Sequence, residues 1–265
     1  MIAHLQIFLA FLWRDFYVYS KRISFYLINY TVLYPLNYII TFGYLVPKTI
    51  MHGADNADVF MITLLSGNVL LIILNITFNL TSTLLYDRET THYIDFQITR
   101  LGPSLILLEH IIFNTLFAFV FLSPFFFICK IILGESFDTN QTSWAYVILI
   151  TFLSCLCIAS YTLCAICIMK STRQISSLWI RVNIPLFVLG GFWVPWFTIF
   201  QVSNIAGYIV LLNPFIYVTE GLRRAITGSE LYFSIPTCVI GLLGFSFLFY
   251  ITAYYSFNKK MDPVS

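Results

Sequence analysis

Charged side chains are scarce in this sequence. Of its 265 residues only 10% are Asp, Glu, Lys or Arg, whereas 59% are hydrophobic. A soluble globular chain carries about 25% charged residues, so the composition argues against a soluble enzyme, and the apolar content argues against a disordered chain. The net charge of +2 is small and scattered, which argues against nucleic-acid binding. The class that remains is a helical membrane protein with several spans.

Nucleotide-binding and catalytic patterns are also missing. The sequence has no Walker A motif and no Gly-rich phosphate loop, so we expect this chain not to hydrolyse ATP. Its four His lie on separate segments, and neither a His-Glu-x-x-His nor a Gly-x-Ser-x-Gly pattern occurs. We therefore expect a protein that is not itself an enzyme and that binds no cofactor.

Metal-ligand spacing is equally sparse. The six cysteines lie inside apolar runs, and Cys164-x-x-Cys167 has neither a second pair nor a nearby His. Small apolar packing residues explain them better than metal or redox chemistry, and no metal site is predicted. No acidic residue lies at the centre of an apolar run, and Glu109 and His110 lie at the mouth of one. This pattern disfavours an ion-coupled carrier and leaves it open as an alternative.

Long apolar runs define the predicted architecture. A span needs about 20 apolar residues to cross about 30 Å of hydrocarbon. Six runs meet this need, and they predict an all-α protein with six transmembrane helices in one membrane domain, residues 1–265. The predicted spans are residues 25–46, 59–85, 111–133, 144–169, 184–200 and 235–255.

Two further segments are predicted to lie at the membrane surface or only partly within it. Residues 1–23 place Leu5, Phe8, Leu9 and Leu12 on one helical face, which predicts an amphipathic interfacial helix. Residues 205–218 are apolar but shorter than a span, and Asn213-Pro214 interrupts them. We predict a re-entrant hairpin region over residues 201–233 before the last span.

Basic residues in the connections predict the orientation. With six spans, ten Lys and Arg lie on the side of the termini and four lie on the other side. Because basic residues accumulate on the cytoplasmic side, both termini are predicted to be cytoplasmic. The connection at residues 86–104 is then cytoplasmic, the hairpin region is external, and a bacterial inner membrane is the expected location.

A polar stripe lies on the second predicted span. Asn68, Asn75 and Asn79 are seven and four residues apart, so they share one helical face. Such amides either bond neighbouring helices or line a path for a polar substrate. Tyr34 and Tyr38 on the first span are assigned to the same path, because aromatic rings contact sugars and acyl chains.

Three motifs resemble those of type-2 ABC exporter permeases (ABC-2). Residues 212–223 are similar to that family's Asn-Pro-aromatic-x-Tyr…Glu-x-x-Arg signature before the last span. Residues 190–195 are similar to its Gly-Gly-x-x-x-Pro segment, and residues 87–103 to its cytoplasmic coupling loop. Tyr93 and Phe96 replace a more Leu-rich run, and the second Pro common after Pro195 is missing.

The resemblance implies half of a membrane pore that another chain drives. A second permease copy, most simply an identical one, and two copies of a cytosolic ABC ATPase subunit are the implied partners, besides membrane lipids. ATP and Mg would bind on the ATPase. Family members export lipid-linked polysaccharides, glycolipids and drugs by alternating access. An ion-coupled carrier, a membrane-embedded enzyme and an assembly subunit stay as alternatives.

The resemblance also implies site residues. Coupling to the ATPase falls on Asp87, Arg88, Glu89, Phe96, Thr99, Arg100, Gly102 and Pro103. The external gate falls on Gly190, Gly191, Pro195, Asn213, Pro214, Tyr217, Glu220 and Arg223. Glu220 and Arg223 are three residues apart on a predicted helix, where they can form an ion pair. The spacing leaves open whether that pair gates the pore or is merely solvated.

Overall fold

A computed structural model describes most of the chain as helix. It covers residues 2–21, 23–33, 36–37, 40–41, 57–90, 100–133 and 141–261, and these residues contain no strand. The first half comprises α1 (Ile2–Ser20), α2 (Ile23–Tyr26), η1 (Leu27–Leu33), α5 (Ala57–Thr90), α7 (Pro103–Leu122), α8 (Phe125–Leu133) and α9 (Trp144–Ile168). The second half comprises η4 (Thr172–Gln174), α10 (Ile175–Leu178), η5 (Trp179–Asn183), α11 (Ile184–Phe187), η6 (Val188–Phe192), α12 (Trp196–Val202), α13 (Asn204–Val210), α14 (Pro214–Thr227) and α15 (Ile235–Met261).

Five helices among the described residues are long and apolar enough to cross a membrane. Twenty residues of α-helix rise about 30 Å, which matches the hydrocarbon thickness. The five are Met61–Thr90, Pro103–Ile132, Trp144–Ile168, Thr172–Phe192 and Ile235–Lys259. The prediction of an all-α membrane protein is therefore confirmed. We call Thr172–Phe192 the connector helix.

The predicted bounds of two spans need comment. Most of residues 34–56 lies outside the described residues, and the described part of the first predicted span, Ile23–Leu33, is too short to cross alone. The bounds predicted for the fifth span, residues 184–200, are wrong, because the connector helix begins at Thr172 and ends at Phe192. The polar residues before Ile184 suggested a loop, yet they form helix. Gly190 and Gly191 depart from helical geometry and so end the span early.

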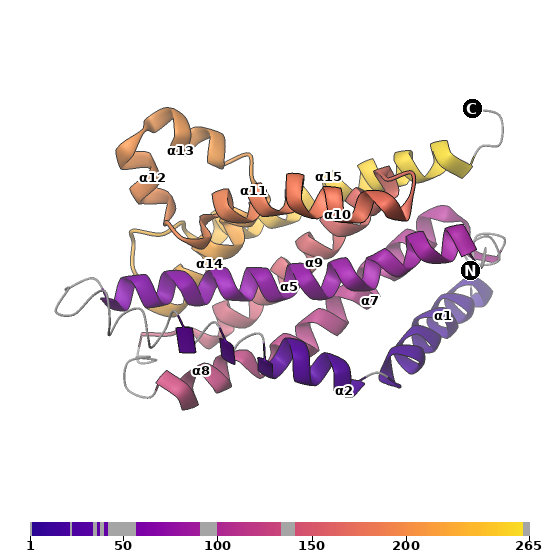
Figure 1. Cartoon of the computed structure of the whole chain (residues 1–265), viewed down its shortest axis with the longest axis horizontal. Helices are drawn as coiled ribbons and strands as arrows, with labels where there is room; N and C mark the ends of the chain where they lie inside the picture. Colours follow the sequence, from indigo (N-terminus) through magenta and orange to yellow (C-terminus); the bar gives the residue numbers. More distant parts are fainter. Residues whose placement is uncertain are drawn as a thin grey trace.

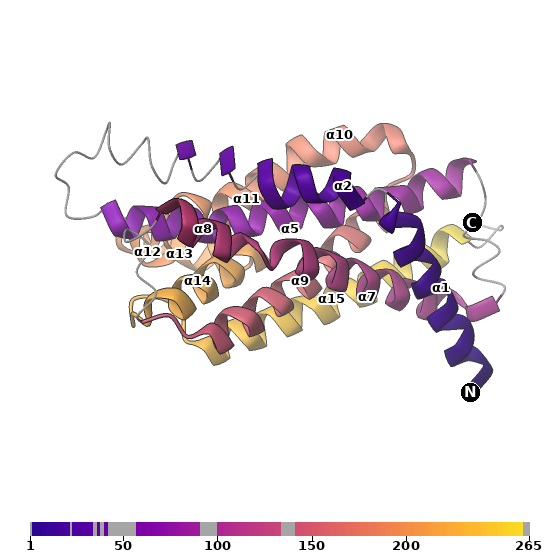
Figure 2. The same cartoon turned by 90° about the horizontal axis from the view of Figure 1, so that it is seen from below.

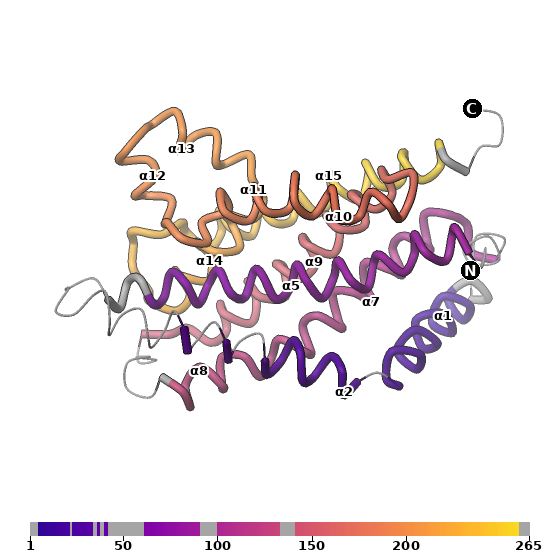
Figure 3. Tube along the Cα trace, in the orientation of Figure 1, coloured from indigo at the N-terminus to yellow at the C-terminus, as the bar shows by residue number. Residues whose placement is uncertain are grey.

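The long helices run roughly side by side (Figures 1 and 2). Figure 3 shows α1 at the same end of the bundle as the C-terminal end of α15, and we call this the terminal end of the bundle. The opposite end carries α12 and α13, which project from the bundle, and we call it the hairpin end. Helices α13 and α14 meet at a bend of 98°.

Helix α5 is the most buried of the long helices. It packs against α7, α9 and α14, and 94% of its most apolar window is buried, against 22% for the connector helix and 17% for α15. A buried polar cluster links α5 to α7 and α9. Asn114 of α7 donates to the Thr81 hydroxyl of α5 at 2.9 Å, and that hydroxyl lies 3.2 Å from the Thr162 hydroxyl of α9. Inter-helical hydrogen bonds of this kind hold helices together where lipid gives no hydrophobic drive.

The connector helix packs on α5 at a glycine. A Cβ atom added to Gly67 would lie 2.2 Å from Cδ2 of Phe192, a ring that is only 2% exposed. Phe192 also contacts the ring of Phe187, with centroids 4.3 Å apart, so it has little room to move. Only glycine permits this approach.

We predict that Gly67→Ala lowers the free energy of unfolding by about 1–3 kcal/mol, because overpacking forces the ring and backbone apart. Gly244→Ala on α15 is the matched control, since a Cβ there meets nothing within 4 Å and alanine favours helix by up to about 1 kcal/mol. Denaturant titration in detergent measures both changes. Equal stability of the two variants would contradict the close packing.

Candidate functional site

Two adjacent glycines turn the chain where the connector helix ends. Gly191 has a φ of +82°, a conformation that favours glycine. A Cβ on Gly190 would lie 2.6 Å from Cβ of Phe215, and one on Gly191 would lie 2.7 Å from Oγ1 of Thr219. The Thr219 hydroxyl donates to the Gly190 carbonyl at 2.8 Å. The backbone of this turn therefore lies directly against α14.

The Asn-Pro pair starts α14 and ties it to the connector helix. Asn213 is the N-cap residue, and its Oδ1 accepts a hydrogen bond from the Phe215 amide at 3.0 Å. Pro214 occupies the first turn, where its missing N–H costs nothing. The Asn213 amide donates to the Leu186 carbonyl at 2.6 Å. Tyr217 holds the preceding bend by donating to the Leu211 carbonyl at 3.0 Å.

A buried ion pair lies at the centre of the hairpin end. Arg223 Nη1 and Glu220 Oε1 are 2.7 Å apart, and both side chains are fully buried. Glu220 Oε1 also accepts the Trp196 amide hydrogen bond at 3.0 Å. Arg223 donates to the Gly191 carbonyl and, at 3.2 Å, to the Thr63 carbonyl. The predicted pairing is present, and the alternative of a solvated pair is wrong.

This arrangement joins four segments through two side chains. The acceptors and donors belong to α5, to the connector helix, to the start of α12 and to α14. Pro195 precedes Trp196 as the N-cap residue of α12, and the Trp196 indole donates to the Gly207 carbonyl at 3.0 Å. A buried charge that is paired and hydrogen-bonded fixes geometry strongly, because every alternative arrangement leaves it unsatisfied. We call Glu220 and Arg223, the backbone groups of Thr63, Gly191 and Trp196 that they bond, and Thr219, which bonds to Gly190, the hairpin lock.

The terminal end of the bundle carries a second linkage between α5 and the connector helix. Glu89 accepts two hydrogen bonds from Thr172, one from the amide at 2.8 Å and one from the hydroxyl at 2.7 Å. Arg88 donates to the carbonyls of Met169 and Lys170 at 3.3 and 3.2 Å. A carboxylate suits this place, because the N-terminal end of a helix carries partial positive charge.

The other predicted coupling residues lie around this linkage or outside the described residues. Phe96 and Thr99 lie outside, so nothing is said of their placement. Asp87 is half-buried, and Arg100 is exposed. Gly102, with a φ of +80°, and Pro103 begin α7, where proline suits the first helical position.

The asparagine stripe makes mostly structural hydrogen bonds. Asn79 donates to the Tyr30 hydroxyl at 2.7 Å, which bonds α5 to η1. Asn75 donates to the Leu71 carbonyl of its own helix, and its side chain also lines a cavity of about 280 Å³ beside the connector helix. Asn68 is buried, and its Oδ1 has no hydrogen-bond partner among the described residues. Tyr34 and Tyr38 lie outside the described residues.

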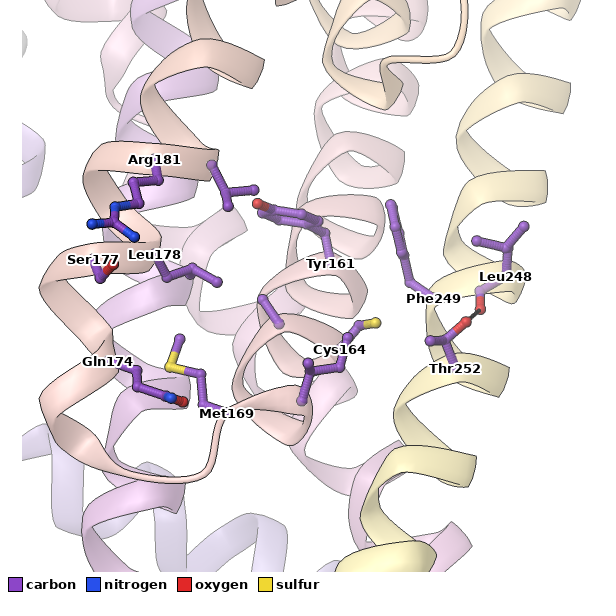
Figure 4. Close-up of a pocket in the computed structure, with 13 residues that line it drawn as sticks. Tyr161, Cys164, Met169, Gln174, Ser177, Leu178, Arg181, Leu248, Phe249 and Thr252 are labelled. Atoms are coloured by element: carbon purple, nitrogen blue, oxygen red, sulfur yellow. Dashed lines mark hydrogen bonds between the residues drawn. The ribbon is translucent and has the colours of Figure 1, made fainter.

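A larger cavity opens between α9, the connector helix and α15 (Figure 4). Its volume is about 610 Å³, and Figure 4 shows Tyr161 and Cys164 facing Leu178 on one side and Phe249 on the other. Most of the lining is apolar. The connector helix contributes the polar residues Gln174, Ser177 and Arg181, and α15 contributes Thr252. A cavity with apolar walls and one cationic side chain suits an amphipathic molecule that carries negative charge.

Sequence reasoning missed several members of the hairpin lock. Thr63 and Trp196 take part in these hydrogen bonds through backbone atoms, which a pattern of side chains cannot predict. Thr219 had a usable signal, because it lies four residues before Arg223 and so on the same face of α14. Phe192 and Gly67 form a contact that only the packing of two helices creates.

The family assignment agrees with this architecture. The sequence profile of the ABC-2 type transporter family matches residues 6–227, which is well over half of the chain. No curated protein and no solved structure gives a significant match. The chain belongs to the ABC-2 type transporter family. It is therefore the multi-pass membrane subunit of a transporter, and members of this family work with a partner ATPase subunit.

We predict that Glu220→Ala lowers the free energy of unfolding by about 3–5 kcal/mol, because it leaves the Arg223 guanidinium buried without its counter-charge. Glu230→Ala is the matched control: its side chain is 96% exposed, and the loss should stay within about 0.5 kcal/mol. Denaturant titration measures both.

A double variant separates the lost pair from the stranded charge. Glu220→Leu combined with Arg223→Met should recover part of the stability, because apolar residues of similar volume can replace a buried pair. A Glu220→Ala protein as stable as the Glu230→Ala control would contradict the burial of the pair.

Proposed function

We propose that this chain is the permease subunit of an ATP-driven exporter. It moves an amphipathic, lipid-linked or glycan-containing substrate, or a drug, out of the cytoplasm by alternating access. Membership of the ABC-2 type transporter family carries the proposal. The missing Walker A motif supports it, since the energy source must then be another chain.

The proposed assembly places the motor below the pore. Two copies of a cytosolic ABC ATPase bind ATP and Mg, and two copies of this chain, most simply identical, enclose the path. The connector helix and α15 are the least buried of the long helices, so their apolar faces suit lipid or a second copy. Both termini are cytoplasmic in this proposal, in a bacterial inner membrane, with α1 as the interfacial helix.

The two linkages of the connector helix suggest how motion crosses the membrane. One end is bonded to Glu89 of α5, which is one of the predicted coupling residues, and the other end turns at Gly191 inside the hairpin lock. A push on the coupling segment by the ATPase would move α5 and the connector helix together. The hairpin lock would carry that movement to the external gate. Rigid elements with two alternative arrangements transmit such changes.

The large cavity supports an amphipathic cargo. Its apolar walls suit acyl chains, and Arg181 suits a phosphate or carboxylate group. The asparagine stripe remains the proposed polar wall of the path, although Asn79 bonds to Tyr30 in this conformation. A chain that alternates between two states can exchange such a bond for a substrate contact.

We predict that Glu89→Ala lowers ATP-driven transport by about 2- to 30-fold while ATP hydrolysis by the complex continues, because the connector helix loses its bonds to α5. Thr90→Ala is the matched control, since the Thr90 hydroxyl bonds only within its own helix, to the Tyr86 carbonyl. The ratio of transport to hydrolysis in proteoliposomes measures the effect. An unchanged ratio would remove Glu89 from the coupling path.

A co-purification experiment tests the assembly. The tagged full-length chain should retain an ATPase that contains a P-loop, and Arg100→Glu should weaken this retention by reversing an exposed charge within the coupling segment. Lys130→Glu, an exposed charge reversal on α8 at the hairpin end, should retain the ATPase fully. Loss in both variants, or in neither, would argue against this docking site.

Reconstitution then tests the function itself. Proteoliposomes that contain this chain and its ATPase should move fluorescent lipid-linked or amphipathic probes only when ATP is hydrolysed. Transport by the chain alone, or transport that follows an ion gradient, would overturn the proposal in favour of a secondary carrier.

A further inference from the structure

Three ligand-type side chains converge where α1 meets α7. Asp15 comes from α1, and Glu109 and His110 come from α7. One ligand atom from each lies within 4.8 Å of the other two. Asp15 is 4% exposed and Glu109 is 1% exposed, so this cluster differs from the solvated acidic groups that are common on surfaces.

Glu109 is the informative member of the cluster. Neither of its carboxylate oxygens has a hydrogen-bond partner among the described residues. The Nδ1 atom of His110 lies 4.0 Å from Oε2, which is too long for a hydrogen bond. A buried carboxylate without partners is strongly disfavoured, so it needs either a proton or a cation.

The charges around Glu109 favour a cation. Arg14 bonds to Asp15 at 2.7 Å and so offsets one negative charge. Asp87 and His110 line the adjoining cavity of about 240 Å³, together with Asn114. Asp15, Asp87 and Glu109 carry three negative charges when ionised and Arg14 offsets one of them, so two remain to balance a divalent ion. The cavity is lined by Asp15 and His110, so it gives water and ions a route to both side chains.

We propose that Asp15, Glu109 and His110 bind a divalent transition-metal ion, with Zn²⁺ as the best fit. An imidazole nitrogen suits Zn²⁺ and disfavours Mg²⁺ and Ca²⁺, which prefer oxygen ligands. Tetrahedral ligands at zinc–ligand distances of about 2.1 Å lie ~3.4 Å apart. The ligand atoms lie within 4.8 Å of one another, so binding one ion would require them to approach by up to ~1.4 Å. A water molecule from the cavity completes the fourth position.

The site would cross-link α1 to α7. Asp87, which lines the same cavity, immediately precedes Arg88 and Glu89, and Glu89 accepts the hydrogen bonds of Thr172 at the start of the connector helix. A bound ion would therefore fix α1 beside the segment proposed to receive the ATPase. The metal site itself does not depend on the proposed transport function.

Metal binding to the tag-free, full-length chain in nanodiscs tests the site. Isothermal titration and elemental analysis should give one Zn²⁺ per chain, and Mg²⁺ should not compete. Glu109→Gln and His110→Gln should each weaken binding by at least about 10-fold, because each removes a ligand while keeping the side-chain volume. Glu230→Gln, an exposed residue far along the chain, should bind like the wild type.

A spectroscopic and a stability measurement make the test independent of folding defects. Bound Co²⁺ should give visible absorption bands that Zn²⁺ abolishes and that Glu109→Gln lacks. Zn²⁺ should raise the melting temperature of the wild type and of Glu230→Gln only. The proposal fails if the wild type binds no stoichiometric Zn²⁺ or if both ligand variants still bind it. The buried Glu109 carboxyl is then neutralised by protonation. Equal binding of Mg²⁺ would overturn the ion class.

Discussion

The hairpin end is organised by a single charge pair that water does not reach. Arg223 and Glu220 are fully buried, and between them they bond to the backbone of three other segments. A buried guanidinium is costly unless acceptors surround it, and although the Arg223 Nε has no partner among the described residues, its two Nη groups bond these segments together. The sharp turn at Gly191, the start of α12 and the position of α14 against α5 all follow from that requirement.

The connector helix has the opposite character. It is little buried, yet it is held at both ends by polar contacts, to Glu89 at one end and to the hairpin lock at the other. It is also bonded between its ends, where the Tyr161 hydroxyl donates to Asn183 at 2.6 Å. A helix that is held mainly by a few polar contacts can move without breaking a large apolar interface. Helix α5, which is almost wholly buried, is the rigid element to which the connector helix is bonded through Glu89, so the two can move together.

Much of this structure follows from the sequence because the relevant signals are local. Composition and the length of the apolar runs predict a helical membrane protein, and the Asn213-Pro214 pair indicates where α14 begins. The spacing of Glu220 and Arg223 predicts their pairing. Their burial could not be predicted, since it depends on Thr63, which is 160 residues away in the chain.

Other features were misjudged or missed for the same physical reason. The residues before Ile184 are polar enough to suggest a loop, but a long arginine side chain such as Arg181 tolerates a helix near the membrane surface. Asp15 and Glu109 belong to distant segments, and neither lies in a ligand motif, so no spacing rule brings them together. Contacts between helices decide these features, and sequence patterns describe single helices.

The π-helical turn of the connector helix, Trp179–Asn183, has a mechanical consequence. Pro185, which has no N–H to donate, lies in the helical turn that follows it. A π-turn holds one residue more than an α-turn. Converting Trp179–Asn183 to α-helix would shift the side chains that follow, up to the glycine break, by one position and rotate them by ~100° about the axis. Such a conversion would reorient one face of the span while its backbone stays helical.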